Sequence, residues 1–224
     1  GALPGAVSLG LITESDIDVA VKRLFTARFR LGMFDPPERV KWAKTPLSVN
    51  DAPAHSELAR KVAQESIVLL KNADATLPLS RSLKRIAVLG PNADDVEVLL
   101  GNYNGDPSHP VTVLKGSRDK AAASGIEVTY AKGCELARDA SDRERALDLA
   151  KAADAVVLVL GIHPRLEGEE MNVDVPGFKG GDRLTLDLPA AQQSLMEDVV
   201  ATGKPVVLVL MSGSALSVSW ANEH

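Results

Sequence analysis

Four short runs of apolar residues, rich in β-branched side chains, mark the second half of the chain. They occupy residues 86–89, 126–130, 155–160 and 206–210. Runs of this length and composition are typical of strands buried on both faces of a sheet. Between them, residues 118–124, 141–153 and 190–202 read as helices. Strands that alternate with helices predict an α/β fold, with a mostly parallel sheet sandwiched between helices.

The first part of the chain has a different pattern. Apolar positions at helical spacing predict a helix over residues 14–31, with Thr13 or Ser15 as its cap and Gly32 at its end. Residues 34–53 contain several prolines and predict an extended linker. A second amphipathic helix is expected over residues 54–71.

Composition excludes several classes of protein. The chain has 25 Lys and Arg against 30 Asp and Glu, and aromatic residues make up only 4%. A net charge of −5 matches neither nucleic acid nor an anionic membrane surface. No segment reaches the ~20 apolar residues of a membrane helix. One cysteine forms no internal disulfide, and four scattered histidines indicate no metal site.

The segment between the third strand and the next helix is the strongest candidate for a site. It runs over residues 161–189, far longer than the ~2–6 residues usual for such connections. It also leaves the carboxyl end of a sheet strand, where open α/β sheets bind their ligands. Position alone therefore points to this segment.

An acidic cluster within that segment offers the chemistry. Glu167, Glu169 and Glu170 place three carboxylates in four positions. Crowded carboxylates favour the protonated form of one of them, and a general acid needs that form. Asp182 and Arg183 follow Gly180-Gly181 and are expected to bring a cation beside the cluster. The alternative is a solvated acidic loop, which composition alone favours.

Two other motifs carry weaker signals. The segment Gly90-Pro91-Asn92-Ala93 follows a strand but is not a phosphate-binding glycine motif, so it is interpreted as a tight turn. The segment Ser212-Gly213-Ser214 lacks the pattern of a serine nucleophile elbow.

The acidic cluster alone is not a glycosidase site. Such a site needs a second carboxylate facing the first across the scissile bond, and no other stretch offers an obvious one. The chain is therefore expected to be a fragment of a longer protein, as its cut-looking ends also suggest.

Seven motifs follow one another along the chain, at residues 63–72, 77–79, 86–94, 101–103, 167–183, 212–216 and 220–221. Together and in this order, they resemble family 3 glycoside hydrolases, the bacterial β-glucosidase and β-xylosidase group. The resemblance implies that residues 1–33 are the remnant of a (β/α)₈-like barrel domain. It implies a linker and entry helix at 34–80. Residues 81–224 would be an α/β sandwich domain, truncated at its C-terminus.

The resemblance also implies a mechanism. Family members are retaining exo-acting enzymes with an Asp nucleophile on the barrel and a Glu acid/base on a loop of the sandwich domain. The family pattern puts Glu167 first as acid/base, Glu169 second and Glu170 third. Arg183 and Asp182 would support the site or bind substrate.

The expected ligands are β-linked glucosides or xylosides, as oligosaccharides or as aryl and alkyl glycosides, and no cofactor or metal is expected. The barrel domain of the intact protein would be a partner, while homo-oligomerisation stays open. The resemblance favours a periplasmic or secreted location over a cytoplasmic one. The competing hypothesis is a non-catalytic carbohydrate-binding or scaffold module of the same α/β class.

Overall fold

The computed structural model describes residues 1–224, which form two compact units, 1–67 and 68–224. The first unit contains the helices α1 (Leu3–Ser8), α2 (Glu14–Arg30) and α3 (Pro53–Ser66). Short 3₁₀ turns lie between α2 and α3 at Pro37–Arg39, Trp42–Lys44 and Leu47–Val49. The segment predicted as an extended linker therefore contains three turns. Pro37 begins the first of them, because a fixed proline φ suits the first position of a helical turn.

Helix α2 begins where the sequence predicts, and Thr13 is its cap. The Thr13 side chain accepts a hydrogen bond from the Asp16 amide, and the Asp16 carboxylate accepts one from the Thr13 amide. This reciprocal capping box satisfies two amide donors that have no partner within the helix. Helix α3 ends at Ser66, five residues before its predicted end. Ile67 and Val68 follow it, and Ile67 has extended torsion angles, which suit β-branched side chains.

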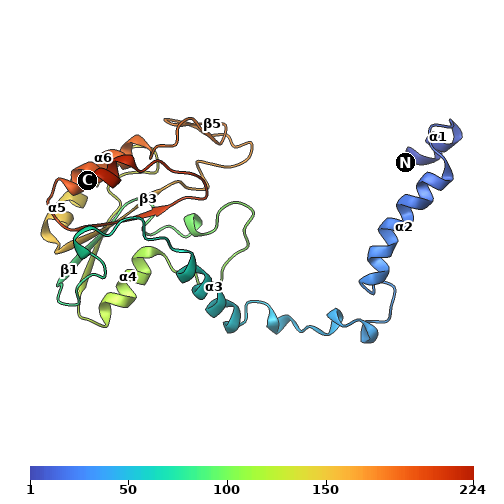
Figure 1. Ribbon diagram of the computed structural model, residues 1–224, viewed down its shortest axis with the longest axis horizontal. Helices are drawn as coiled ribbons and strands as arrows, with labels where there is room; N and C mark the ends of the chain where they lie inside the picture. Colours follow the sequence, from blue (N-terminus) through green and yellow to red (C-terminus); the bar gives the residue numbers. More distant parts are fainter. The chain divides into compact units, whose positions relative to one another are not determined.

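The second unit is built on a four-stranded parallel sheet with the strand order β2-β1-β3-β7 (Figure 1). Its strands are β1 (Arg85–Leu89), β2 (Glu127–Ala131), β3 (Ala155–Gly161) and β7 (Val206–Met211). The central strand β3 pairs with both β1 and β7 and is buried at all seven positions. Each of the four predicted strands is present within one or two residues of its predicted ends, and the parallel α/β fold is confirmed.

Helices cover both faces of this sheet. Alternate residues of β1 and β3, such as Leu89 and Leu158, pack with α5 (Arg143–Ala152) and α6 (Ala190–Val200). The intervening residues, such as Val88 and Val159, pack against Leu114 of α4 (Val113–Ala122). Figure 1 shows α5 and α6 on the face opposite α4. The α4 helix begins five residues earlier than predicted, because the Thr112 side chain caps it by accepting from the Lys115 amide.

The carboxyl end of β3 is tightly fixed. Gly161 has a φ of +139°, and a side chain there would collide with the backbone of Met211 on β7. The buried Gln192 side chain of α6 accepts from the Gly161 amide at 2.8 Å and donates to the Gly161 carbonyl at 2.9 Å. The long segment after Gly161 therefore starts from a rigid point at the edge of the sheet.

That segment contains regular structure of its own. Three two-residue strands, β4 (Asp174–Val175), β5 (Phe178–Lys179) and β6 (Asp182–Arg183), form a small antiparallel sheet. Phe178 is buried with Ile162 and Leu166 in a small apolar cluster beneath it. A final short helix, α7 (Ser219–Glu223), follows β7. None of the helices combines the length and the apolar character needed to cross a membrane.

Candidate active-site loop

The glutamate cluster begins with a tight turn after β3. The carbonyl of His163 accepts hydrogen bonds from the amides of Leu166 and Glu167, at 2.8 and 3.2 Å. Leu166 is buried in the small apolar cluster, so the chain emerges from the core at the next residue. Glu167 is half-buried, whereas Glu169 and Glu170 are exposed. The three carboxylates therefore lie in different environments.

The carboxylate of Glu167 is held by one hydroxyl. Ser214, which follows β7, donates to Glu167 Oε2 at 2.8 Å. The backbone carbonyl of Glu167 accepts from the Asn102 side chain at 3.2 Å. Glu167 Oε1 accepts no hydrogen bond from the chain. One carboxylate oxygen is thus fixed, and the other is free to meet a ligand.

Arg183 reaches Glu167 only through Ser214. Its guanidinium donates to the Ser214 hydroxyl at 3.0 Å and to the carbonyl oxygens of Ala215 and Asp187. It forms no ion pair with any carboxylate of the cluster. Arg183, the cation expected beside the carboxylates, is therefore separated from Glu167 by the hydroxyl of Ser214. The reason is that the backbone carbonyls of the neighbouring segments take up its remaining donors. The Asp182 side chain is exposed and makes no hydrogen bond.

Glu169 and Glu170 have different contacts and backbone conformations from Glu167. The Tyr103 hydroxyl donates a short hydrogen bond to Glu169 Oε2, and this carboxylate raises the pKa of the Tyr103 phenol above its ordinary value. Glu170 has a φ of +48°, an uncommon conformation for a residue other than glycine. The amide of Gly168, which precedes Glu169, donates to the carbonyl of Gly181 at 3.1 Å. Gly181 has no room for a side chain at that contact, so the two glycines bring the turn against the small sheet.

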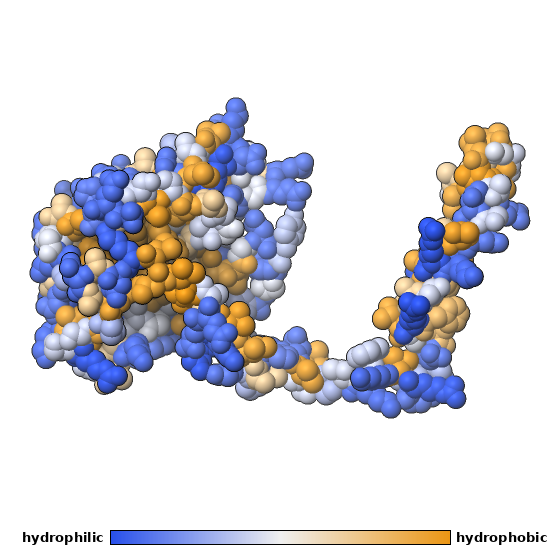
Figure 2. All heavy atoms as spheres, in the orientation of Figure 1, coloured by the Kyte–Doolittle hydropathy of each residue, from blue (hydrophilic) through white to orange (hydrophobic).

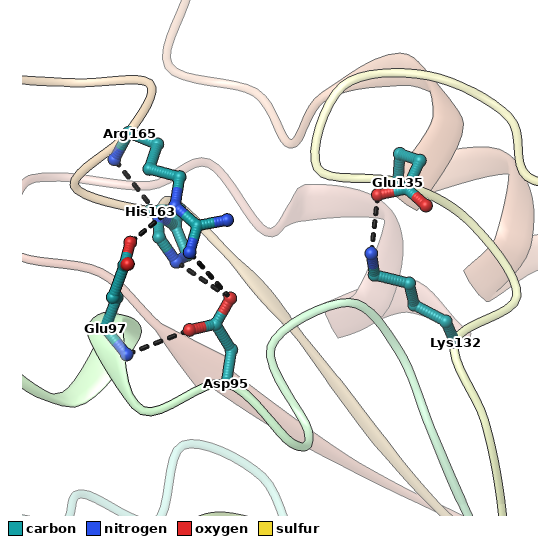
Figure 3. Close-up of polar contacts among 6 residues, drawn as sticks. All are labelled: Asp95, Glu97, Lys132, Glu135, His163 and Arg165. Carbon is teal, nitrogen blue, oxygen red and sulfur yellow. Dashed lines mark hydrogen bonds and ion pairs between the residues drawn. The ribbon is translucent and has the colours of Figure 1, made fainter.

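A second polar cluster lies behind the turn (Figure 3). The amide of Arg165 donates to His163 Nδ1 at 3.0 Å, and His163 Nε2 lies 3.3 Å from Asp95 Oδ2 without good hydrogen-bond geometry. Arg165 also pairs with Glu97, and Asp95 Oδ1 accepts from the Glu97 amide at 2.8 Å. Burial lowers the pKa of His163, and the Asp95 carboxylate only partly opposes this effect. His163 is therefore neutral at neutral pH.

Asp95, Glu97 and His163 bring their ligand atoms within 4.8 Å of one another, so a metal site has to be considered. A metal-binding histidine uses the lone pair of one ring nitrogen and donates a proton from the other. Here Nδ1 accepts from the Arg165 amide, so the proton of the neutral ring is on Nε2, the nitrogen that faces the carboxylates. The Arg165 guanidinium already neutralises Glu97. These residues do not fit a metal ion.

The comparisons with known proteins now bear on this fold and loop. The model of the glycosyl hydrolase family 3 C-terminal domain matches residues 67–224, about two thirds of the chain. The chain belongs to glycosyl hydrolase family 3. Its family 3 relatives include beta-D-xylosidase 3 of Arabidopsis thaliana, 41% identical over 221 residues that cover 97% of this chain and 26% of that protein. A periplasmic beta-glucosidase of Salmonella typhimurium is 32% identical over 242 residues, covering 96% of this chain and 30% of that protein.

Solved structures of family 3 enzymes match as well. A GH3 exo-beta-xylosidase in complex with a xylobiose aziridine activity-based probe superposes with a TM-score of 0.84 at 33% identity. The match covers 98% of this chain and 27% of that one. The family 3 chain described here thus spans about a quarter of the length of these xylosidases.

The contacts in and behind the glutamate loop were not predicted from the sequence. The small residues Ser212-Gly213-Ser214 favour close packing of the strand end over a nucleophile, and neither interpretation includes the hydrogen bond from Ser214 to Glu167. Neither Asp95 nor His163 was singled out, because 68 positions separate them. Asn102 and Tyr103 were noted as part of the family motif Gly101-Asn102-Tyr103, and this motif was the one available signal.

Proposed function

We propose that this chain is the loop-bearing α/β domain of a retaining, exo-acting β-glycosidase that hydrolyses terminal β-D-xylosyl or β-D-glucosyl residues. In this proposal Glu167 is the acid/base, and the nucleophilic Asp belongs to a barrel domain outside this chain. The residue boundaries 1–33, 34–80 and 81–224, for barrel remnant, linker and sandwich domain, are part of the same proposal.

The presentation of Glu167 is the observation that carries the proposal. Its backbone is fixed by the turn at His163 and by Asn102, and its carboxylate is fixed at one oxygen by Ser214. A catalytic carboxyl group has to be held in a defined orientation and still offer an oxygen to the substrate. Glu167 meets both conditions, since its Oε1 has no partner in the chain.

The proposed reaction has two steps. In the first, the barrel Asp attacks the anomeric carbon while the protonated Glu167 gives its proton to the departing glycosidic oxygen. In the second, the ionised Glu167 takes a proton from water, and that water displaces the Asp from the sugar. The Ser214 hydroxyl donates to Glu167 Oε2 and stabilises the charged carboxylate. Arg183 donates to the Ser214 oxygen and so orients this hydroxyl.

Glu169 is the second choice and Glu170 the third. The bond from Tyr103 occupies one oxygen of Glu169, and both side chains are exposed without the backbone restraints of Glu167. Arg183 is proposed as a supporting residue that acts through Ser214. Asp182 is proposed to bind substrate, because its carboxylate is exposed and free of protein partners.

The substrate and location are proposals drawn from the relatives. The identity of 41% to a protein named as a xylosidase supports β-xylosides as the first substrates to test, with β-glucosides second. The similarity to a periplasmic enzyme supports a periplasmic or secreted location. A non-catalytic module of the same fold is the competing function, and no contact of the loop favours it.

The intact enzyme carrying Glu167→Ala tests the proposal. Loss of the acid should lower kcat/KM for xylobiose by about 10²- to 10⁴-fold, because its leaving group needs a proton. The kcat/KM for 2,4-dinitrophenyl β-xyloside should change little, because its leaving group needs no proton. The kcat for this substrate should fall, and added azide should restore part of it by attacking the glycosyl-enzyme. Glu169→Ala and Glu170→Ala are the matched controls. Leaving-group dependence in Glu169→Ala alone would assign the acid/base role to Glu169. If none of the three variants shows leaving-group dependence, the loop does not supply the acid/base.

A further inference from the structure

Two loops that follow neighbouring strands are joined beside the candidate acid/base. The loop after β1 carries Asp95 and Glu97, and the loop after β3 carries His163 and Arg165 (Figure 3). Asp95 lies at 3.3 Å from His163 and 3.9 Å from Arg165, and Glu97 pairs with Arg165. We refer to these four residues as the clamp.

His163 connects the clamp to Glu167. Its carbonyl accepts from the Glu167 amide, and its ring nitrogen Nδ1 accepts from the Arg165 amide. The imidazole thus fixes the middle of the turn at Arg165, and the backbone carbonyl of the same residue fixes its end at Glu167. The ring is completely buried, so its position is set by its neighbours and not by water.

Asp95 faces the other nitrogen of that ring at 3.3 Å. Because Nδ1 accepts a hydrogen bond, Nε2 carries the proton and faces the Asp95 carboxylate. Asp95 is itself held, since its other oxygen accepts from the Glu97 amide at 2.8 Å. The contact joins a fixed anion to a buried N–H dipole, and such a contact strengthens where water is excluded.

We propose that Asp95 and His163 are positioning residues for Glu167, and that they keep its carboxyl group in the position and orientation needed for proton transfer. The proposal rests on the proposed role of Glu167. Arg165 and Glu97 add a second, more exposed connection between the same two loops. The clamp does not touch the substrate and acts only through the turn.

The central experiment compares Asp95→Ala with Asp95→Asn in the intact enzyme. Loss of the carboxylate should lower kcat/KM for xylobiose by about 10- to 100-fold, since displacement of a catalytic group by about 1 Å costs about 100-fold. The value for 2,4-dinitrophenyl β-xyloside should change much less. Asn keeps an oxygen that can face Nε2–H, so Asp95→Asn should stay within about fivefold of the unaltered enzyme.

A matched control uses another ion pair at the same edge of the sheet. Lys132 pairs with Glu135 at 2.6 Å and has no contact with the turn (Figure 3). Lys132→Ala should change neither substrate by more than about twofold, as is usual for exposed ion pairs. Thermal unfolding of every variant then separates lost positioning from lost stability.

The double variant Asp95→Ala/Glu167→Ala decides whether Asp95 acts through Glu167. A positioning residue adds no further leaving-group discrimination once Glu167 is absent, whereas a general structural defect lowers both substrates by the same additional factor. If Asp95→Ala prevents folding, Glu97→Ala replaces it, because Glu97 is exposed. The same selective loss is then expected, at about threefold to fivefold for xylobiose and less than about twofold for the dinitrophenyl substrate, because Arg165 loses its partner in the turn.

The outcomes separate the two proposals. If Glu167→Ala shows leaving-group dependence and azide rescue while Asp95→Ala behaves as Lys132→Ala does, the positioning role is overturned and the proposed function stands. Equal losses for both substrates in Asp95→Ala, or an additive double variant, also overturn it. If Glu167→Ala itself shows no dependence, the proposed function fails and the positioning role fails with it. Selective loss in Asp95→Ala, recovery in Asp95→Asn and a non-additive double variant support it.

Discussion

The two units of the chain are stabilised in different ways. In residues 1–67 no helix buries a residue, and the clearest stabilising features are local, such as the capping box of α2. Apolar side chains are exposed along this unit, as Figure 2 shows. In residues 68–224 the seven positions of β3 are all buried, and helices cover both faces of the sheet. Local signals thus suffice to define a helix, whereas a stable core needs partners that are distant in sequence.

Chemical reactivity should show the largest difference between the units. Burial raises the pKa of the Cys134 thiol to about 12, from an ordinary value of 9.0. Its thiolate fraction at pH 8 is then lower by about a thousandfold, and alkylation slows accordingly. Mass spectrometry of iodoacetamide-treated protein should find Cys134 unmodified until urea unfolds residues 68–224. In a Cys134→Ala background, Ser15→Cys in exposed α2 should react at once. Rapid labelling of native Cys134 would contradict the buried environment.

Removal of one core side chain should also separate the units. Leu158 is fully buried between β1, β7 and the helices, so Leu158→Ala should lower the free energy of unfolding by about 2–5 kcal/mol. Leu24 of α2 is 54% exposed, and Leu24→Ala should change it by less than about 0.5 kcal/mol. Urea denaturation followed by circular dichroism measures both. Equal losses would mean that Leu24 is buried in solution.

A buried polar contact should have the next largest effect. Gln192→Leu leaves the amide and carbonyl of Gly161 without partners, which should cost about 1–3 kcal/mol. The side chain of its neighbour Gln193 hydrogen-bonds only to Glu197 on the same helix, so Gln193→Leu is the control and should change stability little. Hydrogen exchange of the Gly161 amide should speed up in the first variant alone. Unchanged exchange there would show that the contact does not protect this edge.

In the first unit the capping residue should matter most. Thr13→Ala removes the hydroxyl acceptor of the capping box and should destabilise α2 by about 1 kcal/mol. Thr26→Ala, in the middle of the same helix, removes only a bond to the Lys22 carbonyl and is the control. Helicity of a peptide spanning residues 9–33 should fall in the first variant and not in the second. Equal helicity in both would indicate that packing and not capping defines this end.

The smallest expected effect concerns acid stability. Hydrogen bonds from the backbone amides of Arg85 and Lys84 lower the pKa of Asp154 below 3.8. Because the folded value lies below the unfolded value, the stabilisation is complete above pH 3.8 and is lost as the pH falls through the folded pKa. The stability difference between Asp154→Asn and the unaltered chain should therefore be largest at neutral pH and shrink below pH 3.8. A difference that does not vary with pH would contradict this.

The fold of residues 68–224 was predictable because its strands are continuous apolar runs that alternate with helical segments. The small sheet β4–β6 was not predicted, since two-residue strands have no detectable period. The position of the candidate site is predicted by one rule, that ligands bind at the carboxyl ends of parallel strands, and it stays a prediction. Its contacts did not follow, because Ser214 and Glu167 lie 47 positions apart and only the finished sheet brings them together. The role of Glu167 itself stays a prediction.

The clamp has a consequence for recombination between family 3 genes. The residues that fix Glu167 come from loops after β1, β3 and β7, and all of them lie within residues 68–224. On the proposed positioning role, we expect active chimeras to be those that exchange this stretch as one block. A crossover between residues 97 and 163 would join loops that have not evolved together, whereas one near residue 67 would leave every restraint on the glutamate intact.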